Sequence, residues 1–179
     1  MINNVQGAYE ATRYLAKMGH TQMRYLKSSV PINNFDERFE GYQKGLLHSN
    51  LSFNPDWVFR LEPTMEAAGL SFQKSIRRPL PTAFFADNDI IAIGAMKALK
   101  EAGLRIPQDV SVVGFDNLPM CAMMQPAMTT IQVPKRQLGK YAVNLLIQRI
   151  GEPAEDFVKI EVGTHLIKRE SVRNLKPDV

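Results

Sequence analysis

The feature that most constrains this chain is a repeated alternation of short apolar runs with longer segments of helical spacing, at intervals of about 30 residues. The apolar runs that we expect to be strands are Met23–Leu26, Trp57–Leu61, Thr82–Ala86 and Val110–Phe115. The last two, TAFFA and VSVVGF, are almost continuously apolar. A strand has this composition when helices cover both faces of its sheet, as they do in parallel sheets.

The segments between these runs carry apolar residues at helical spacing. The stripes are Ala8, Ala11, Thr12, Leu15 and Met18, then Phe35, Phe39, Tyr42 and Leu46, and then Ile91, Ala95, Ala98 and Leu99. Gly19 and Gly103 stand where two of these helices would end, and Met65–Ile76 is a further predicted helix. The alternation indicates βαβ units, so we expect an α/β fold with a doubly wound parallel sheet between two layers of helices.

The pattern changes after Pro126. Thr129–Val133 is a predicted strand, and Pro134 suits the first position of a helix that runs to Ile150. The apolar face of that helix consists of Leu138, Tyr141, Ala142, Leu145, Leu146 and Ile150. Two more strands are predicted, at Phe157–Val162 and His165–Ile167.

Composition excludes several classes of protein. With one cysteine in 179 residues, the chain is neither a disulfide-stapled secreted scaffold nor a cysteine-based zinc protein. It is 45% hydrophobic and 22% charged, which is typical of a globular domain, and its length suggests one domain with two small lobes possible. No secretory signal and no membrane span is apparent, so we expect a cytoplasmic location. The net charge of +4 comes from scattered basic residues, which favours a solvated surface over a nucleic-acid footprint.

Motifs for catalysis are missing from the sequence. It has no nucleophile elbow, no phosphate loop and no dinucleotide fingerprint, and its three histidines are far apart. The run Asp87-Asn88-Asp89 could suggest magnesium or a phosphate-handling hydrolase, but capping of a helix explains these residues as well. We therefore expect no enzyme, no metal and no cofactor.

Three polar residues lie where ligands bind in open parallel sheets, beyond the carboxyl ends of the strands. Asn88 follows TAFFA, Asp116 follows VSVVGF, and Arg38 lies in the first turn of the helix after the first strand. Each has an ordinary structural explanation: a helix cap, a turn residue and a surface ion pair. Together they share one edge of one sheet. A guanidinium, an amide and a carboxylate suit a polyhydroxylated ligand, whose hydroxyls need both donors and acceptors.

The segment PMCAMMQPAM is rich in adaptable apolar side chains. Core filling explains such a segment, and a contact between subunits explains it nearly as well because its two prolines favour an irregular, external position. The possible dimer interface consists of Met120, Cys121, Met123 and Met124.

Five segments, in this order and spacing, resemble the lactose-repressor (LacI/GalR) family of bacterial transcription regulators. They are GAYEATRYLAKMGH, the DERFEGY run, ADNDIIAIGAMKALKEAGLRIPQDVSVVGFDN, the MTTIQVP run and KRESV. The similarity covers nearly the whole chain and falls on the sugar-sensing core, which looks like a periplasmic sugar-binding protein.

The resemblance implies roles for individual residues. The arginine of the R-x-x-G-aromatic run, the asparagine before the helix and the acid after the V-G-aromatic strand contact the effector, and here they are Arg38, Asn88 and Asp116. A wall of the cleft would come from Thr64, Met65 and Phe115, without the aromatic residue that the family often has before the third helix. Asn3, Asn4 and Gln6 lie near the first crossover between the lobes.

The resemblance also implies an organisation. Residues 1–128 plus 155–179 would form the C-terminal lobe of an effector-binding domain, and residues 129–154 would cross to a first lobe. Family members carry a DNA-binding headpiece and that first lobe ahead of the part that matches, so the chain looks like a truncated sensor. The expected partners are a sugar or sugar phosphate, a second copy of the chain, and operator DNA only through a headpiece. A solute-binding module for transport, with the same fold, is the alternative.

The predicted helix Pro134–Ile150 would lose its packing partner if the first lobe is missing. Exposing four or five large apolar side chains would cost on the order of 7 to 15 kcal/mol, which a marginally stable domain cannot easily absorb. We therefore expect this helix to pack against another copy of the chain or to repack on its own lobe.

Overall fold

The protein, seen as a computed structural model, forms a six-stranded sheet in the order β2-β1-β3-β4-β5-β6. The structure describes residues 1–76, 79–152 and 156–176. Strands β1 to β5 are parallel to their neighbours, and β6 runs antiparallel to β5. The prediction of a doubly wound α/β fold is confirmed.

Apart from α5, which we did not predict, and a strand that is missing from the described residues, the elements follow the predicted order. The helices are α1 (Asn4–Lys17), α2 (Asn33–Leu47), α3 (Met65–Ser75), α4 (Asp89–Glu101), α5 (Met120–Met123) and α6 (Lys135–Gly151), with a 3-10 turn at Pro55–Trp57. The strands are β1 (Met23–Ser28), β2 (Val58–Leu61), β3 (Ala83–Ala86), β4 (Ser111–Asp116), β5 (Thr129–Gln132) and β6 (His165–Ile167). Gly19 and Gly103, with φ of +91° and +77°, follow α1 and α4 as expected of residues that end a helix.

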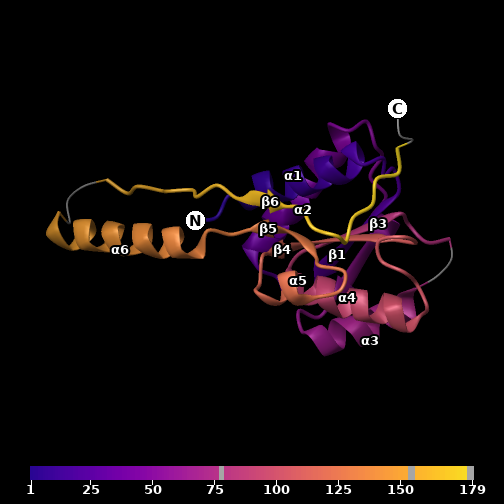
Figure 1. The fold of residues 1–179 in the computed structure, drawn as a ribbon. Helices are drawn as coiled ribbons and strands as arrows, with labels where there is room; N and C mark the ends of the chain where they lie inside the picture. Colours follow the sequence, from indigo (N-terminus) through magenta and orange to yellow (C-terminus); the bar gives the residue numbers. More distant parts are fainter. Residues whose placement is uncertain (77–78, 153–155, 177–179) are drawn as a thin grey trace.

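Two hydrophobic cores lie on opposite faces of the sheet. One packs β-strand side chains against α1 and α2, and the other packs them against α3 and α4 (Figure 1). Phe84 and Phe85 are adjacent on β3 and belong to different cores, because successive side chains of a strand point to opposite faces. Because helices cover both faces of the sheet, every side chain along the apolar run of β3 packs into one of the two cores.

Glycines allow the helices of each layer to approach closely. A Cβ atom at Gly45 on α2 would lie 2.5 Å from the Cβ of Thr12 on α1. A Cβ at Gly94 on α4 would lie 2.4 Å from the backbone oxygen of Met65 on α3. Both distances are too short for a side chain, so these pairs of helices depend on glycine at the contact.

The prediction of a strand at Phe157–Val162 is wrong. Val162 makes a single parallel bridge with Ile2, and residues 156–161 are extended without pairing in a sheet. The apolar spacing suits a sheet, but among the described residues only the N-terminal segment Met1–Asn3 offers hydrogen bonds there, and only to Ile160 and Val162. Phe157 is 91% exposed.

An arm extends from the body of the lobe. It consists of α6 and the extended segment 156–161, which Figure 1 shows running back along the helix. None of the residues of α6 is buried, and Ile150 at its end is 73% exposed. In this structure α6 does not pack onto the sheet of its own lobe. Strand β5 does belong to that sheet, so the chain leaves the body after Gln132. The boundary that we expected at residues 154 and 155 lies outside the described residues.

Among the described residues, the structure has no helix that is both long enough and apolar enough to span a membrane.

Candidate functional site

The carboxyl edge of the sheet gathers the three predicted polar residues. Asp116 is the last residue of β4, Asn88 lies between β3 and α4, and Arg38 lies in the second turn of α2, which follows β1. Strands β1, β3 and β4 are consecutive in the sheet and parallel, so their carboxyl ends meet at one place.

Arg38 is the centre of this edge. Its side chain is only 4% exposed, and its guanidinium donates to acceptors on α1, on β4 and in the turn after β3. Nε donates to Oδ1 of Asn4 (3.0 Å), Nη1 to the backbone oxygen of Asp87 (2.5 Å), and Nη2 to Oδ1 of Asp116 (3.1 Å). The guanidinium carbon also lies 3.8 Å from the centroid of the Phe115 ring, within the range of a cation–π interaction. Arg38 is therefore a buried cation with a fixed orientation, and not a partner in a surface ion pair.

Asp116 faces Arg38 from an unusual backbone conformation. Its backbone φ is +114°, a value that residues other than glycine rarely adopt. Its side chain remains 27% exposed. Burial raises the pKa of this carboxyl, the positive charge of Arg38 opposes that shift, and the negative charge of Asp89 adds to it. Lys135 Nζ donates to the backbone oxygen of Asp116 (2.7 Å) and so ties the start of α6 to the site. The carboxylate is positioned to accept a further donor from solvent or a ligand.

Asn88 caps α4, as its ordinary structural explanation predicts. Its Oδ1 accepts from the backbone N–H of Ile91 (2.9 Å), and its backbone is extended. Within the described residues no group accepts a hydrogen bond from its Nδ2, so both N–H donors of this amide are unused. Capping and ligand contact are therefore compatible in this residue.

Asp87 is a part of the site whose role we did not predict. Its carboxylate is fully buried and accepts from the Tyr25 hydroxyl and from the Ser28 backbone N–H (2.5 Å). Burial raises its pKa to about 6, against the opposing effects of those hydrogen bonds and of the charges of Arg38 and Lys27. Its partners lie some 60 positions earlier in the chain, so local sequence carries no signal for the pairing; only the presence of an acid at the end of a buried strand hinted at it.

Asp89 serves a structural network next to the site. Its carboxylate accepts from Thr130 Oγ1 (2.6 Å), the Leu118 backbone N–H (2.8 Å) and Cys121 Sγ (3.1 Å). Burial raises the pKa of Asp89, and these three hydrogen bonds oppose the shift. Asp87 and Asp89 thus engage different networks. No group of three or more His, Cys, Asp or Glu residues suited to a metal ion occurs in the described part of the chain.

The predicted wall residues lie at different depths. Thr64 is exposed and caps α3 through the Ala67 backbone N–H (3.2 Å), whereas Met65 is partly buried against the core. Phe115 is completely buried and lies beneath the guanidinium of Arg38. Phe115 therefore contributes to the site indirectly, by packing against the guanidinium of Arg38.

The methionine-rich segment is divided between the core and the surface. Cys121 is fully buried. Burial raises the pKa of its thiol to about 12, and the negative charge of Asp89 acts in the same direction. Such a thiol is a poor nucleophile. Met120 and Met124 pack partly against the core, and Met123 is 78% exposed.

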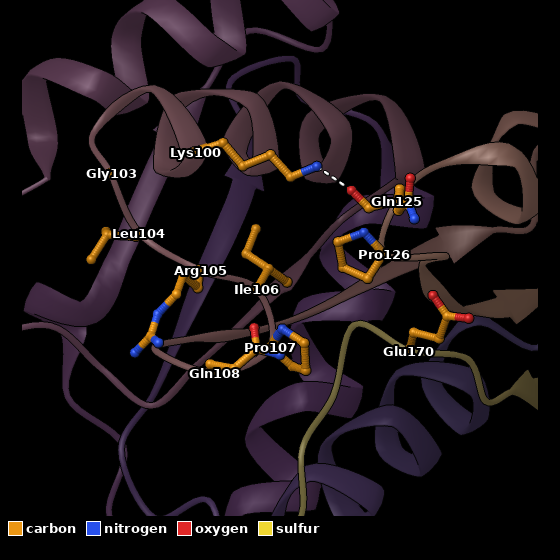
Figure 2. A pocket seen from close by; sticks show the side chains of 10 residues that line it. All are labelled: Lys100, Gly103, Leu104, Arg105, Ile106, Pro107, Gln108, Gln125, Pro126 and Glu170. Atoms are coloured by element: carbon orange, nitrogen blue, oxygen red, sulfur yellow. Dashed lines mark hydrogen bonds between the residues drawn. The ribbon is translucent and has the colours of Figure 1, made fainter.

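A large open hollow lies at the opposite edge of the lobe. It has a volume of about 810 Å³ and lies between the end of α4 and the turn before β5 (Figure 2). Lys100, on its rim, donates to the backbone oxygen of Gln125. Arg105 makes a double hydrogen bond to Asp109 (2.7 and 3.0 Å). Because both cations already have partners, this hollow is a weaker candidate for a ligand than the edge around Arg38.

Comparison with known proteins gives consistent matches. A model of the periplasmic binding protein-like domain matches residues 12–172. The HTH-type transcriptional repressor PurR of Aliivibrio salmonicida (strain LFI1238) is 35% identical over 174 residues, which is 97% of this chain and 52% of the repressor. PurR of Aliivibrio fischeri (strain MJ11) is 37% identical over 180 residues, 96% of this chain and 52% of the repressor. The chain thus spans about half the length of these curated relatives.

Solved structures agree with this match. A LacI family transcriptional regulator of Enterococcus faecium with bound ribose superposes with a TM-score of 0.87 at 29% identity, over 98% of this chain and 65% of the other. The complex of the transcriptional regulator CelR with cellobiose superposes with a TM-score of 0.89 at 29% identity, over 95% of this chain and 52% of the other.

Proposed function

Because the chain belongs to the family of periplasmic binding protein-like domains and resembles LacI-type regulators along its length, we propose that it senses a small effector in such a regulator. The effector that the site favours is a polyhydroxylated molecule such as a sugar. Similar proteins are transcriptional regulators, and we propose that this chain likewise acts by binding rather than by catalysis, in the cytoplasm.

The buried guanidinium of Arg38 carries the proposal. It is fixed by α1, by the residue after β3 and by β4, at the edge where open parallel sheets bind ligands. Asp116 beside it supplies a partly exposed acceptor, and Asn88 supplies donors. A hydroxyl group both donates and accepts, so this set of groups can satisfy adjacent hydroxyls of one ring.

We propose that the body, which lies before α6 and after residue 161 and includes β5, is one lobe of the sensor. Of the expected crossing segment 129–154, the part from Pro134 onward would reach a second lobe, supplied by the part of the longer relatives that the 179 residues do not match. The exposed apolar side chains of α6 support this organisation, since such surface is normally covered. Closure of two lobes on the effector would shift the regulator between states by no more than the effector's difference in affinity for them.

A homodimer and operator DNA are the proposed macromolecular partners. The dimer contact would include the surface methionines of the segment Met120–Met124, of which Met123 is the most exposed. DNA contact would require a headpiece of the kind implied by the relatives' description as HTH-type repressors. The 179 residues alone are therefore expected not to bind an operator at physiological salt.

Titration with D-ribose, followed by two-dimensional NMR of the labelled chain, tests the proposed function. We expect weak binding, because one lobe offers only one wall, with shift changes around Arg38, Asn88 and Asp116. The variant Arg38→Met should abolish those changes, and Arg60→Met, which alters an exposed arginine on β2, should not. Micromolar affinity would contradict the one-wall organisation. If saturating ribose and cellobiose leave all three residues unperturbed, the proposed effector class is wrong.

A further inference from the structure

The Asp87 side chain fastens two strands at the floor of the site. Asp87 follows β3, and its carboxylate accepts from two residues of β1, the neighbouring strand. The donors are the Tyr25 hydroxyl and the Ser28 backbone N–H, the latter at 2.5 Å. All three residues are at most 1% exposed. Burying a carboxylate at this depth costs free energy unless it is well paired, so its presence here requires an explanation.

The backbone of the same residue holds the arginine. The Asp87 carbonyl oxygen accepts from Nη1 of Arg38 at 2.5 Å. Because the side chain of Asp87 is anchored to β1, the position of its carbonyl is fixed relative to α2, which follows β1. The Asp87 carboxyl and the arginine are thereby connected through the backbone of one residue.

Charge connects the two residues as well. The groups that face the Asp87 carboxyl are Tyr25 and Lys27 from β1 and Arg38 from α2. Lys27 is paired with Asp36 at 2.7 Å, and Tyr42 faces the carboxyl only through Tyr25. Arg38 therefore has two acids near it, Asp116 in direct contact and Asp87 behind. Removing the charge of Asp87 would leave Asp116 as the nearest counter-ion and would draw that carboxylate closer to the guanidinium.

We propose that Asp87 is a positioning residue whose ionised carboxylate holds Arg38 in its ligand-binding geometry, so that effector binding is coupled to a proton on Asp87. This inference rests on the proposed function, since it concerns the same arginine. The proton would reduce the affinity for a neutral polyol, because a tighter Arg38–Asp116 pair leaves fewer acceptor positions for a hydroxyl.

The network can accept the proton without breaking. A protonated Asp87 can donate to the Tyr25 oxygen while its other oxygen still accepts from the Ser28 N–H, which reverses one hydrogen bond and keeps both contacts. Burial raises the pKa of Asp87 to about 6, which places the transition close to physiological pH.

Side-chain NMR of the full chain tests the inference without any ligand. The ¹³Cγ resonance of Asp87 and the ¹⁵Nε and ¹³Cζ resonances of Arg38 would be followed from pH 4.5 to 8. We expect all three to report a transition with a common midpoint near pH 6. In Asp87→Asn the Arg38 transition should disappear, and in Asp116→Asn it should remain.

Tyr25→Phe provides a second, conservative variant in case Asp87→Asn fails to fold. The hydrogen bond from Tyr25 lowers the pKa of Asp87, so its loss should move the common midpoint to higher pH. Arg38 resonances that do not titrate in the wild type, or that titrate unchanged in Asp87→Asn, would overturn the inference. So would an unchanged midpoint in Tyr25→Phe.

Binding of D-ribose at pH 5 and pH 7.5 then separates the two proposals. Weaker binding at pH 5 that becomes independent of pH in Asp87→Asn supports the coupling, and binding that is equal at both pH values in the wild type overturns it. Failure of ribose to bind at either pH contradicts the proposed effector class, while the Arg38 titration still decides whether Asp87 positions the arginine.

Discussion

Helices α4 and α6 are both amphipathic in sequence but differ completely in burial. Most residues of α4 are buried between α3 and the sheet, whereas no residue of α6 is buried. Both carry apolar residues at helical spacing and polar residues between them. The spacing therefore predicts that a segment is helical and which face is apolar, but it does not predict what covers that face. The comparison separates a body stabilised within the chain from an arm that depends on something else.

The largest expected effect distinguishes the body from the arm directly. Phe85→Ala removes a fully buried ring from β3 and should lower the free energy of unfolding by about 3 to 5 kcal/mol. Ile147→Ala on α6, where the side chain is 63% exposed, should change it by no more than about 0.5 kcal/mol. Urea denaturation of both variants measures the difference. Similar losses in the two would show that α6 is packed in solution.

The next effect concerns the buried cation at the site. Arg38→Met leaves the carboxylate of Asp116, the Asn4 oxygen and the Asp87 carbonyl without their donor. Because Asp116 is partly exposed, we expect a loss of about 2 kcal/mol, below the range for a fully buried pair. Arg60→Met on the exposed face of β2 is the matched control and should be nearly neutral. Equal thermal midpoints for both variants would show that the network contributes nothing to stability.

The pH dependence of the body should carry the signature of Asp87. Its pKa is raised to about 6 in the folded chain from 3.8, so between these values the folded state binds more protons than the unfolded state. The contribution of Asp87 to the free energy of unfolding therefore increases as pH falls through this window, by about 3 kcal/mol. His20, whose pKa is lowered to about 4, has the opposite effect between pH 6.5 and 4.

Subtraction isolates the Asp87 contribution. The His20 contribution is common to the wild type and Asp87→Asn, so it cancels in the difference between their unfolding free energies. That difference should therefore vary between pH 7.5 and 4.5 through Asp87 alone. Urea denaturation at several pH values measures this difference. A difference that stays constant over that range would contradict the buried, titrating carboxyl.

The smallest effect on stability, and the clearest on assembly, is expected in the arm. The double variant Leu146→Lys/Ile150→Lys should leave the free energy of unfolding within about 0.5 kcal/mol of the wild type. It should nevertheless reduce self-association, because these side chains are 60% and 73% exposed and apolar. Sedimentation velocity over a range of concentrations measures this. Leu70→Lys, at a 56% exposed position on α3, is the control. A wild type that sediments as a monomer at all concentrations would rule out association through α6.

The body of the fold could be predicted because its signals are local. TAFFA and VSVVGF are strands covered on both faces, and glycines stand after the last turns of α1 and α4. The resemblance to the LacI/GalR family, drawn from motifs in these same segments, is confirmed by the family match and by similar structures. The strand expected at Phe157–Val162 failed because pairing requires a neighbour, and the apolar pattern of one segment contains no information about its neighbour.

The site could be predicted only in part, for the same reason. Arg38, Asn88 and Asp116 were accessible to reasoning because each lies near the end of a strand or the start of a helix. The roles that we assign to them as ligand contacts remain predictions. The sequence placed Asn4 near the crossover without a partner, and its contact with Arg38 joins distant parts of the chain. The Tyr25–Asp87 pair likewise joins distant parts of the chain and became visible only when β1 and β3 were placed side by side.

The attachment of the arm has a mechanical consequence. Near the lobe, Ile2 and Val162 form a parallel bridge, supported by Val162 N–H to the Met1 oxygen (2.8 Å) and Asn3 N–H to the Val162 oxygen (3.0 Å). The chain also leaves the body beyond β5. Two chain segments thus join the arm to the body, with few hydrogen bonds between them and the lobe. Because few contacts hold this junction, we expect movement of the arm about it to be the softest large-scale motion of the chain.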